Sequence, residues 1–377
     1  MLKRTLVDTL KKRLRDYPTV ALVGSRQCGK TTLAKTLAKK YYDLEQESDR
    51  LRLDLEWNEL FKNKDLVVLD EAQTFPEIFP RLRGAIDQKK RKGKFLLLGS
   101  IAPSLMHHVA ESLAGRLSLV ELTPLHYQEV TKPTLKKHWL RGGFPDGGIL
   151  KPSRFPQWQK DYLDLLVQRD LPLWGLPSKP QTTARLLRLL AAVHGQMWNA
   201  SQIGQSLGLS YHTVNQITDF LQGTFLIRKL QPYSANLKKR LVRTPKIYWR
   251  DSGLLHALWN VADYDALLHH PGVGASWEGY VIEQILNWFS QHGELIEPFY
   301  FRTSDGHEID LLFEFRKKRW AIECKLTTTP RPADLQRLNL VADMVHADKR
   351  ILVCQTDQKM GSDGQQICPL EDFFEML

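Results

Sequence analysis

Residues Gly24-Ser-Arg-Gln-Cys-Gly-Lys-Thr31 decide the fold of this chain, because they match the pattern G-x-x-x-x-G-K-[ST] at every fixed position. An apolar, β-branched run at 19–23 precedes them, and a helical run at 31–40 follows. Glycines in such a loop let backbone N–H groups wrap a phosphate, and the helix N-terminus adds a favourable dipole. The stretch therefore predicts a nucleotide-phosphate site.

The side chains of this loop have separate predicted roles. Lys30 is expected to reach the β- and γ-phosphates, and Thr31 is expected to supply a hydroxyl to Mg²⁺. The residues expected to contact the nucleotide are Gly24, Ser25, Arg26, Gln27, Cys28, Gly29, Lys30, Thr31 and Thr32.

Two acids follow the next apolar run, at 66–69. An aspartate at the carboxyl end of a parallel strand faces the crevice in which ligands bind, so Asp70 is expected to hold Mg²⁺ through water. Glu71 is placed to orient and deprotonate the attacking water. These acids complete the predicted phosphate-transfer site.

Further candidates end or precede later strand-like runs. Ser100 follows the run at 95–98, which we expect to lie between the first two strands, and it would contact the γ-phosphate or the attacking water. Arg116 precedes the run at 117–122 and is expected to stabilise transition-state charge in its own subunit or a neighbour's. Arg169 is a rival for that role. For either arginine the alternative is a structural salt bridge.

Strand-like and helical runs alternate through the first part of the chain, with helical patterns at 78–88 and 103–113. This alternation predicts an α/β fold with a parallel sheet covered by helices on both faces. Prolines near residue 178 mark a domain boundary. The predicted domains are 1–178, which holds the phosphate loop and a helical extension, 179–262 and 263–377.

The middle domain is predicted from a run of three helices and a β-hairpin over 183–250, the order of a winged helix-turn-helix. Tyr211 and His212 begin the second helix of the motif, and a basic loop at 238–240 joins the hairpin strands. One interpretation is DNA contact. The other is a packing module that has the same shape.

The third domain contains a predicted hairpin at 308–325 around the charged turn Arg316-Lys-Lys-Arg319. If the turn is centred between its two lysines, Asp310 lies opposite Lys325, and Glu323 is a diagonal neighbour on the same face.

Two carboxylates and a lysine on one face are costly to bury without a partner. Asp310 and Glu323, joined by Glu278 from the helical run before them, therefore predict a site for Mg²⁺ or Mn²⁺. Lys325 would position or activate a water there. The alternative is an exposed salt bridge across a hairpin.

The composition excludes several classes of protein. The chain has 377 residues, 42% of them hydrophobic and 25% charged, which is unlike a disordered, collagen-like or disulfide-rich chain. Its formal net charge of +11 is compatible with a polyanionic partner. Four scattered cysteines and the lack of a long apolar run predict a cytoplasmic protein without a membrane partner.

Several motifs together resemble one widespread group of prokaryotic AAA-type ATPases with a winged helix and a C-terminal restriction-endonuclease-like domain of undefined function. Besides the phosphate loop, the motifs are Leu69-Asp-Glu-Ala-Gln73, Gly99-Ser100, Ser112-Leu-Ala-Gly-Arg116, Gly142-Gly-Phe-Pro145, Trp277-Glu-Gly-Tyr-Val281, Glu308-Ile-Asp310 and Glu323-Cys-Lys325. The resemblance implies a P-loop NTPase sheet, ATP binding and hydrolysis with Mg²⁺, and similarity of the C-terminal acids to those of D…E-x-K nucleases.

Three hypotheses about function follow. The first is an ATPase whose turnover drives a conformational change in the C-terminal half. The second is an ATP-regulated, metal-dependent DNA endonuclease. The third is a nucleotide-gated module that docks a partner. ATP, DNA and a second copy of the chain are the partners that these hypotheses allow.

Cys28 departs from the family pattern, in which an aliphatic residue is expected. It lies at a helix N-terminus and close to Lys30, and both features make a thiol more reactive. We therefore expect Cys28 to alkylate faster than the other cysteines. The alternative is a thiol that is turned inward against the sheet.

Overall fold

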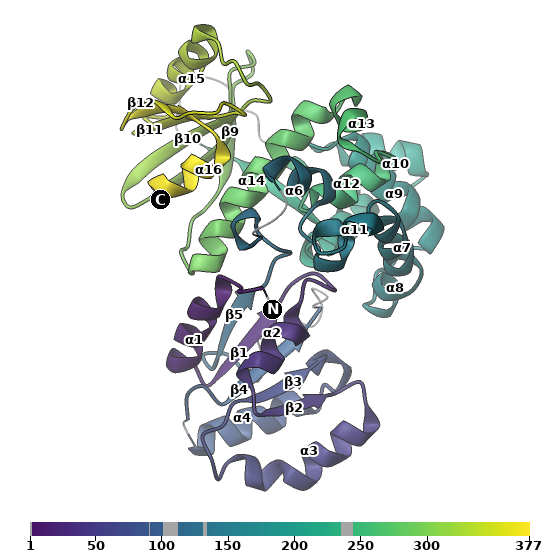
Figure 1. The fold of residues 1–377 in the computed structure, drawn as a ribbon. Helices are drawn as coiled ribbons and strands as arrows, with labels where there is room; N and C mark the ends of the chain where they lie inside the picture. The colour runs from purple at the N-terminus through teal and green to yellow at the C-terminus, as the bar shows by residue number, and fades with distance from the viewer. Residues whose placement is uncertain (1, 90, 101–111, 131–133, 235–243) are drawn as a thin grey trace.

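The computed structural model describes residues 2–89, 91–100, 112–130, 134–234 and 244–377 (Figure 1). The predicted helix at 103–113 lies almost wholly outside these ranges. The N-terminal sheet and its helices form the lower end of the molecule in Figure 1, and the C-terminal sheet lies at the upper left with the middle helices to its right.

The N-terminal sheet is parallel at every strand pair, as the alternation of strands and helices predicts. Its strands are β1 (Thr19–Val23), β2 (Lys40–Asp43), β3 (Val67–Asp70), β4 (Phe95–Gly99) and β5 (Leu117–Glu121). Their order is β2-β3-β4-β1-β5, so β4 lies between β1 and β3 as expected. All carboxyl ends therefore meet at one edge of the sheet.

Helices cover both faces of this sheet, because alternate strand residues point to opposite sides. The helices are α1 (Leu6–Asp16), α2 (Lys30–Leu37), α3 (Glu47–Leu60) and α4 (Ile78–Lys89). Val20 and Leu22 pack with α1 and α2 in one core, whereas Ala21 and Val23 pack with α3 and α4 in the other. The two cores confirm the predicted P-loop NTPase fold class.

The middle of the chain is mainly helical. Its helices are α6 (Leu135–Arg141), α7 (Gln157–Leu165), α8 (Leu171–Leu173), α9 (Pro180–Ala192), α10 (Ala200–Leu207), α11 (Tyr211–Gly223), α12 (Ser252–Leu258) and α13 (Tyr264–His269). Three helices, α9 to α11, precede the hairpin of β6 (Ile227–Pro232) and β7 (Lys246–Trp249), in the order expected for a winged helix. The basic loop 238–240 lies outside the described residues.

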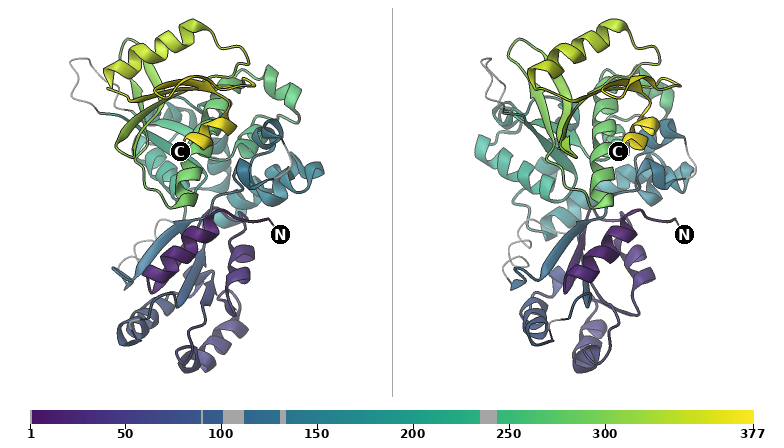
Figure 2. Two further views of the ribbon diagram at one scale, coloured as in Figure 1. Left: turned by 60° about the vertical axis from the view of Figure 1, so that its left-hand side comes forward. Right: turned by 90° about the vertical axis from the view of Figure 1, so that its left-hand side faces the viewer.

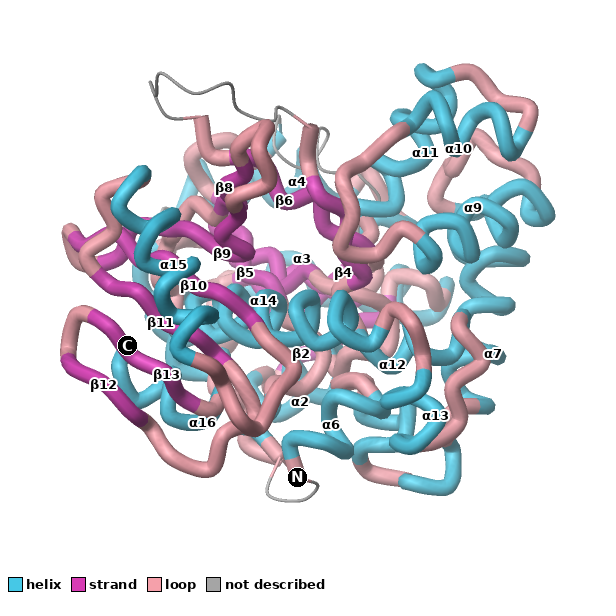
Figure 3. The backbone as a smooth tube through the Cα atoms, turned by 90° about the horizontal axis from the view of Figure 1, so that it is seen from above, coloured by secondary structure: helices cyan, strands magenta, loops and turns pink. Residues whose placement is uncertain are grey.

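The C-terminal sheet has eight strands in the order β12-β13-β11-β10-β9-β8-β6-β7. Besides β6 and β7, its strands are β8 (Phe299–Arg302), β9 (Glu308–Phe315), β10 (Lys318–Cys324), β11 (Lys349–Val353), β12 (Met360–Ser362) and β13 (Gln365–Cys368). The associated helices are α14 (Val273–His292), α15 (Pro332–Met344) and α16 (Leu370–Phe373). Figure 3 shows this mixed sheet from above.

One strand pair joins the middle segment to the C-terminal segment. Strand β6 runs parallel to β8, with Gln231 beside Phe299 and Pro232 beside Tyr300. The predicted boundary at 262/263 therefore passes between two segments that share one sheet, and the domain limits remain a prediction. Within the part of the chain that the structure describes, no helix is both long and apolar enough to cross a membrane.

Helix α14 lies at the centre of the molecule, between the C-terminal sheet and the helices of the middle segment (Figures 1 and 2). Its last turn also contacts the N-terminal unit, where Thr9 Oγ1 donates to the carbonyl of Gln291 at 2.8 Å. Because α14 is buried on nearly all sides, its polar groups need partners inside the protein.

Four buried histidines from four different segments are hydrogen-bond partners for polar groups of α14. His126 Nε2 lies 3.1 Å from the carbonyl of Gln284, and His194 Nε2 lies 3.2 Å from that of Ala275. The other two contact hydroxyls of α14: His138 Nδ1 lies 3.0 Å from Tyr280 Oη, and His256 Nε2 lies 2.7 Å from Ser276 Oγ.

Each of these four rings is held in its neutral form. In every case one ring nitrogen faces a backbone carbonyl and the other faces a backbone N–H or a hydroxyl, so one nitrogen donates and the other accepts. Burial lowers the pKa of His126 and His194 to about 3, and that of His138 and His256 to about 4. The neutral rings are thus part of the folded state.

We expect each of these four histidines to lower the stability against urea as the pH drops below about 6.5, the unfolded pKa of histidine, whereas buried carboxyls with a raised pKa, such as Asp251, act in the opposite direction. Below that pH the histidines of the unfolded chain bind protons, whereas the buried rings of the folded protein do not. Each ring therefore lowers the free energy of unfolding by about 1.4 kcal/mol per pH unit until its folded pKa is reached. His138→Gln should flatten the slope by about that amount between roughly pH 6 and pH 5. His212→Gln is the control, because His212 is exposed. An equal slope in His138→Gln and wild type would contradict the assignment.

Candidate functional site

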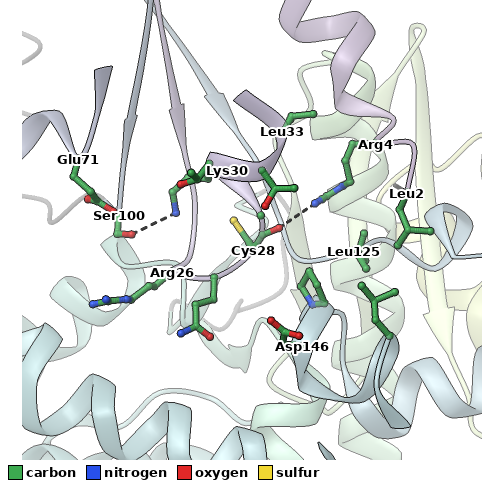
Figure 4. A pocket seen from close by; sticks show the side chains of 16 residues that line it. Leu2, Arg4, Arg26, Cys28, Lys30, Leu33, Glu71, Ser100, Leu125 and Asp146 are labelled. Atoms are coloured by element: carbon green, nitrogen blue, oxygen red, sulfur yellow. Dashed lines mark hydrogen bonds between the residues drawn. The ribbon is translucent and has the colours of Figure 1, made fainter. Parts of the chain in front are cut away.

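The phosphate loop has the backbone geometry that its sequence predicts. Gly24 has φ 149° and Gly29 has φ 104°, values that other residues rarely adopt. Lys30 folds back over the loop: its Nζ donates to the carbonyls of Gly24 and Ser25, each at 2.9 Å. Its ammonium lies 3.4 Å from Ser100 Oγ at the end of β4, so the loop and β4 meet at Lys30 (Figure 4).

Asp70, at the end of β3, lies next to the first turn of α2. Thr31 Oγ1 donates to Asp70 Oδ2 at 2.7 Å, and Tyr41 Oη donates to the same oxygen at 2.7 Å. The backbone N–H of Glu71 donates to Asp70 Oδ1 at 2.9 Å. A hydroxyl and a carboxylate held side by side are the hard oxygen donors that suit Mg²⁺, so these residues fit the ion that the sequence predicts.

Glu71 lines a cavity that Lys30 and Ser100 also line (Figure 4). Its backbone is left-handed, with φ 49°, a conformation that costs a non-glycine residue energy and turns the side chain away from the strand. The side-chain amide of Gln73 donates to the Glu71 carboxylate. Burial raises the pKa of Glu71, which favours its use as a proton acceptor near neutral pH.

This cavity has a volume of about 540 Å³, and Thr31 also lines it. Lys30, Ser100 and Glu71 lie together at one part of it, and Leu2 and Leu125 lie on the other side of the loop (Figure 4). Polar groups suited to phosphates are therefore continuous with an apolar surface suited to a flat base.

The two candidate arginines lie at different places relative to the phosphate loop. Arg116 precedes β5 and so lies at the amino edge of the sheet, opposite the phosphate loop, where it pairs with Asp87 at 2.6 Å. A role for Arg116 in its own subunit thus finds no support, and a role in a neighbouring copy stays a prediction. Arg169 pairs at 2.9 Å with Asp170 Oδ1, the same oxygen that Arg26 of the loop contacts, so Arg169 lies beside the loop and its role stays a prediction.

The expectation of a reactive Cys28 is wrong. The residue is fully buried, and its thiol faces inward and donates to the carbonyl of Leu122 at 3.1 Å. Alkylating reagents cannot reach a thiol that is packed against the end of β5. The helix dipole at the loop does not change this, because it acts on the reactivity of the thiol and not on its accessibility. Cys28 still lines the nucleotide cavity.

The loop is also held by contacts that sequence reasoning did not predict. Arg26 pairs with the buried Asp170, and Tyr162 Oη donates to the Arg26 carbonyl at 3.3 Å. From the other side, Arg4 Nη1 donates to the Cys28 carbonyl at 3.0 Å. These contacts have no local sequence signal, since the partners are far apart in the chain.

A second cavity, of about 550 Å³, lies beside the C-terminal sheet and gathers four carboxylates: Glu278, Glu308, Asp310 and Glu323. The first comes from α14, the next two from β9 and the last from β10. We call it the acidic cavity. Three of its carboxylates were expected to come together, and the structure does bring those three into one cavity.

The hairpin that carries two of these acids has a different register from the expected one. Strand pairing places Lys318 opposite Phe315, so the turn is centred between Arg316 and Lys317, both of which have positive φ as a two-residue hairpin turn requires. Continuing the pairing puts Asp310 opposite Glu323. The displacement is two residues, an even number, so both acids remain on one face.

Lys246 of β7 enters the acidic cavity, and sequence reasoning missed it. Its Nζ lies 2.9 Å from Glu278 Oε1 and 3.9 Å from Asp310 Oδ1, and it contacts Glu308 more closely. The available signal was a lysine at the head of the otherwise apolar strand Lys246-Ile-Tyr-Trp249.

The carboxylates outnumber their nearest cation. Burial, followed by the charges of neighbouring carboxylates, raises the pKa of Asp310 well above its usual range and that of Glu323 to about 8. Without a further cation, both groups therefore favour the protonated form at neutral pH.

Lys325 does not join these acids, because its ammonium pairs with Asp334 at the start of α15. Within the described ranges, no group of three or more His, Cys, Asp or Glu side chains has the arrangement of a metal site.

Three parts of the chain match known protein families. Residues 16–131 match an AAA domain, residues 132–265 a domain of unknown function (DUF8612), and residues 273–373 another domain of unknown function (DUF4143). The fold, the phosphate loop and this match make the N-terminal unit an AAA-type P-loop ATPase domain, a class that binds nucleotide, usually with Mg²⁺.

Two known relatives match most of the chain. The uncharacterized proteins Mb2031c of Mycobacterium bovis and Rv2008c of Mycobacterium tuberculosis are each 36% identical to it over 347 residues, which cover 90% of this chain and 77% of theirs. The chain belongs to the family of these two mycobacterial proteins.

Likeness to solved structures is remote. The Aeropyrum pernix ORC1 protein in complex with DNA has 13% identity and a TM-score of 0.29, covering 68% of this chain and 91% of that one. The Thermotoga maritima RuvB Holliday junction branch migration motor has 16% identity and a TM-score of 0.29. The match covers 59% of this chain and 88% of that one.

We expect Gly24→Ala to weaken nucleotide binding, because the added methyl group would lie 2.1 Å from the carbonyl oxygen of Leu122. Overpacking of this kind destabilises a protein by about 1–3 kcal/mol. The loop would relieve the clash by moving away from the end of β5, and this movement would disturb the phosphate site. Gly84→Ala is the matched control, since that position is helical and no heavy atom lies within 4 Å of the new group. Titration with a fluorescent ATP analogue should separate the variants, and equal affinities would refute the close approach.

Proposed function

We propose that the chain binds ATP with Mg²⁺, hydrolyses it, and uses turnover to change the conformation of its C-terminal half. The main supporting observation is that Lys30, Thr31, Glu71 and Ser100 line one cavity at the carboxyl edge of the sheet, with Asp70 hydrogen-bonded to Thr31. Membership of the AAA class supports nucleotide binding.

Each residue has a distinct role in this proposal. Lys30 and the backbone N–H groups of the loop hold the phosphates, and Ser100 contacts the γ-phosphate or the attacking water. Thr31 and Asp70 would hold Mg²⁺, which when bound neutralises charge on the phosphates. Glu71 orients the attacking water and accepts its proton.

Transmission to the C-terminal half is supported by charged contacts at the ends of β5 and of the loop. Arg250, directly after β7, donates to Glu121 of β5 at 2.6 Å and contacts Glu283 of α14 at 3.2 Å. Arg26 of the loop pairs with Asp170. A shift of the phosphate loop on binding or hydrolysis would therefore act on both the middle helices and α14.

We expect Lys30→Ala to abolish nucleotide binding, because Lys30 contacts phosphate in the ground state. The stabilisation of about 2.7 kcal/mol that wild type should gain at a hundredfold excess of nucleotide over its Kd would then be lost. Glu71→Gln should bind nucleotide normally and turn over roughly 10²–10⁴-fold more slowly, because the amide cannot accept the proton. Thermal shift and phosphate release measure the two effects.

Two results would contradict these roles. Wild-type turnover in Glu71→Gln would remove that residue from the chemistry. Binding without turnover in wild type and Glu71→Gln alike would favour the nucleotide-gated docking module over the ATPase.

A second candidate function is a metal-dependent DNA endonuclease regulated by ATP. The acidic cavity favours it, because hard carboxylate oxygens on two strands and a helix are the donors that Mg²⁺ or Mn²⁺ prefers. Helix α11 and the hairpin of β6 and β7 would contact DNA, and Tyr211 at the start of α11 is 53% exposed.

Plasmid nicking in Mg²⁺ and Mn²⁺ tests this candidate. We expect Asp310→Asn to lower nicking by about 100-fold or more, since it removes a metal-binding oxygen, and to leave the ATPase rate unchanged because the two cavities are separate. Nicking that survives in Asp310→Asn, or no nicking by wild type, would sink the endonuclease hypothesis.

A further inference from the structure

The acidic cavity already contains a cation that belongs to the protein. The ammonium of Lys246 contacts Glu278, Glu308 and Asp310, and the lysine side chain is only 5% exposed. These three carboxylates come from α14 and β9, whereas Lys246 comes from β7 at the edge of the sheet. The lysine is thus inserted into the acid cluster from a separate element.

The position of Lys246 is well defined by its surroundings. Its backbone pairs with Leu230 of β6 on one side and forms a bridge to Met197 on the other. Its ammonium also lies 5.6 Å from the ring centre of Tyr300 and 6.0 Å from that of Tyr248. Aromatic faces and carboxylates together stabilise a positive charge at this point.

We propose that Lys246 is a tethered cation that blocks the acidic cavity, so that a divalent cation can bind only when the ammonium leaves the carboxylates. An ammonium and a divalent cation require the same oxygens, and two positive charges a few ångströms apart repel strongly at a site shielded from water. The proposal rests on the cation site proposed above, but on neither DNA cleavage nor ATP turnover.

The position of Lys246 among the acids also explains why the carboxylates lie apart from one another. The described acids have no metal-site arrangement because three of them are placed around an ammonium, which accepts longer contacts than a small divalent cation does. Glu323 is the fourth acid of the cavity and has no ion pair with Lys246. Departure of the lysine would free the oxygens of Glu278, Glu308 and Asp310 that it contacts, while Arg302 would still pair with the other oxygen of Glu308.

The test is Mn²⁺ affinity, measured in the nucleotide-free, full-length protein by the electron paramagnetic resonance of free Mn²⁺. Lys246→Met should bind Mn²⁺ at least about tenfold more tightly than wild type, because a competitor that fills a site nine-tenths of the time lowers its apparent affinity tenfold. Adding Asp310→Asn to Lys246→Met should remove the gain and so locate it in the acidic cavity.

Matched controls keep the result specific. Lys349→Met removes another buried, ion-paired lysine from the same sheet, on β11 and next to Asp363, and should leave Mn²⁺ affinity as in wild type. Lys246→Gln guards against a folding defect of the methionine variant, with circular dichroism confirming that each variant is folded.

The outcomes are distinct. A gain in both Lys246 variants that depends on Asp310 supports the proposal. Equal or weaker Mn²⁺ binding in the folded Lys246 variants overturns the blocking role while the cation site stands. No specific Mn²⁺ binding by any variant overturns the cation site and the blocking role together, and leaves the ATPase proposal untouched.

Discussion

The architecture depends on one constraint: helix α14 is buried and still carries polar groups that need partners. Neutral histidines from four segments contact its backbone and hydroxyls, and Arg228 and Arg250 pair with its Glu283. An unpaired group at any of these points would cost about 1–3 kcal/mol, and more for the charge. The helix therefore dictates where β5, the middle helices and the C-terminal sheet can lie.

Two ion pairs join helix α14 to β7 and the residue after it. Lys246 pairs with Glu278 at 2.9 Å in the acidic cavity, and Arg250 pairs with Glu283 at 3.2 Å beside the N-terminal sheet. Because Glu278 and Glu283 lie on one helix, a movement of that helix would displace both ion pairs. The proposed coupling would follow these contacts from the carboxyl end of β5 to the acids of β9.

Features that depend on local sequence could be predicted, and features that depend on distant packing could not. The phosphate loop and Asp70 follow from spacing and strand ends, so their convergence was foreseeable. The inward turn of Cys28 depends on the Leu122 carbonyl, ninety-four residues away along the chain, and the entry of Lys246 depends on which strands share a sheet. The hairpin register was displaced by two residues because Arg316 and Lys317 take the turn, yet the shared face survived because an even shift preserves the side of the sheet.

The pairing of β6 with β8 has a consequence for how this chain can be divided. The residues that match the two domains of unknown function, 132–265 and 273–373, each contain only part of the eight-stranded sheet. A gene fragment that began at β8 would leave the N–H and C=O groups of that strand unpaired along an open edge, where other chains could add. We therefore expect the two segments to be stable only together, because separating them would expose an edge that favours aggregation.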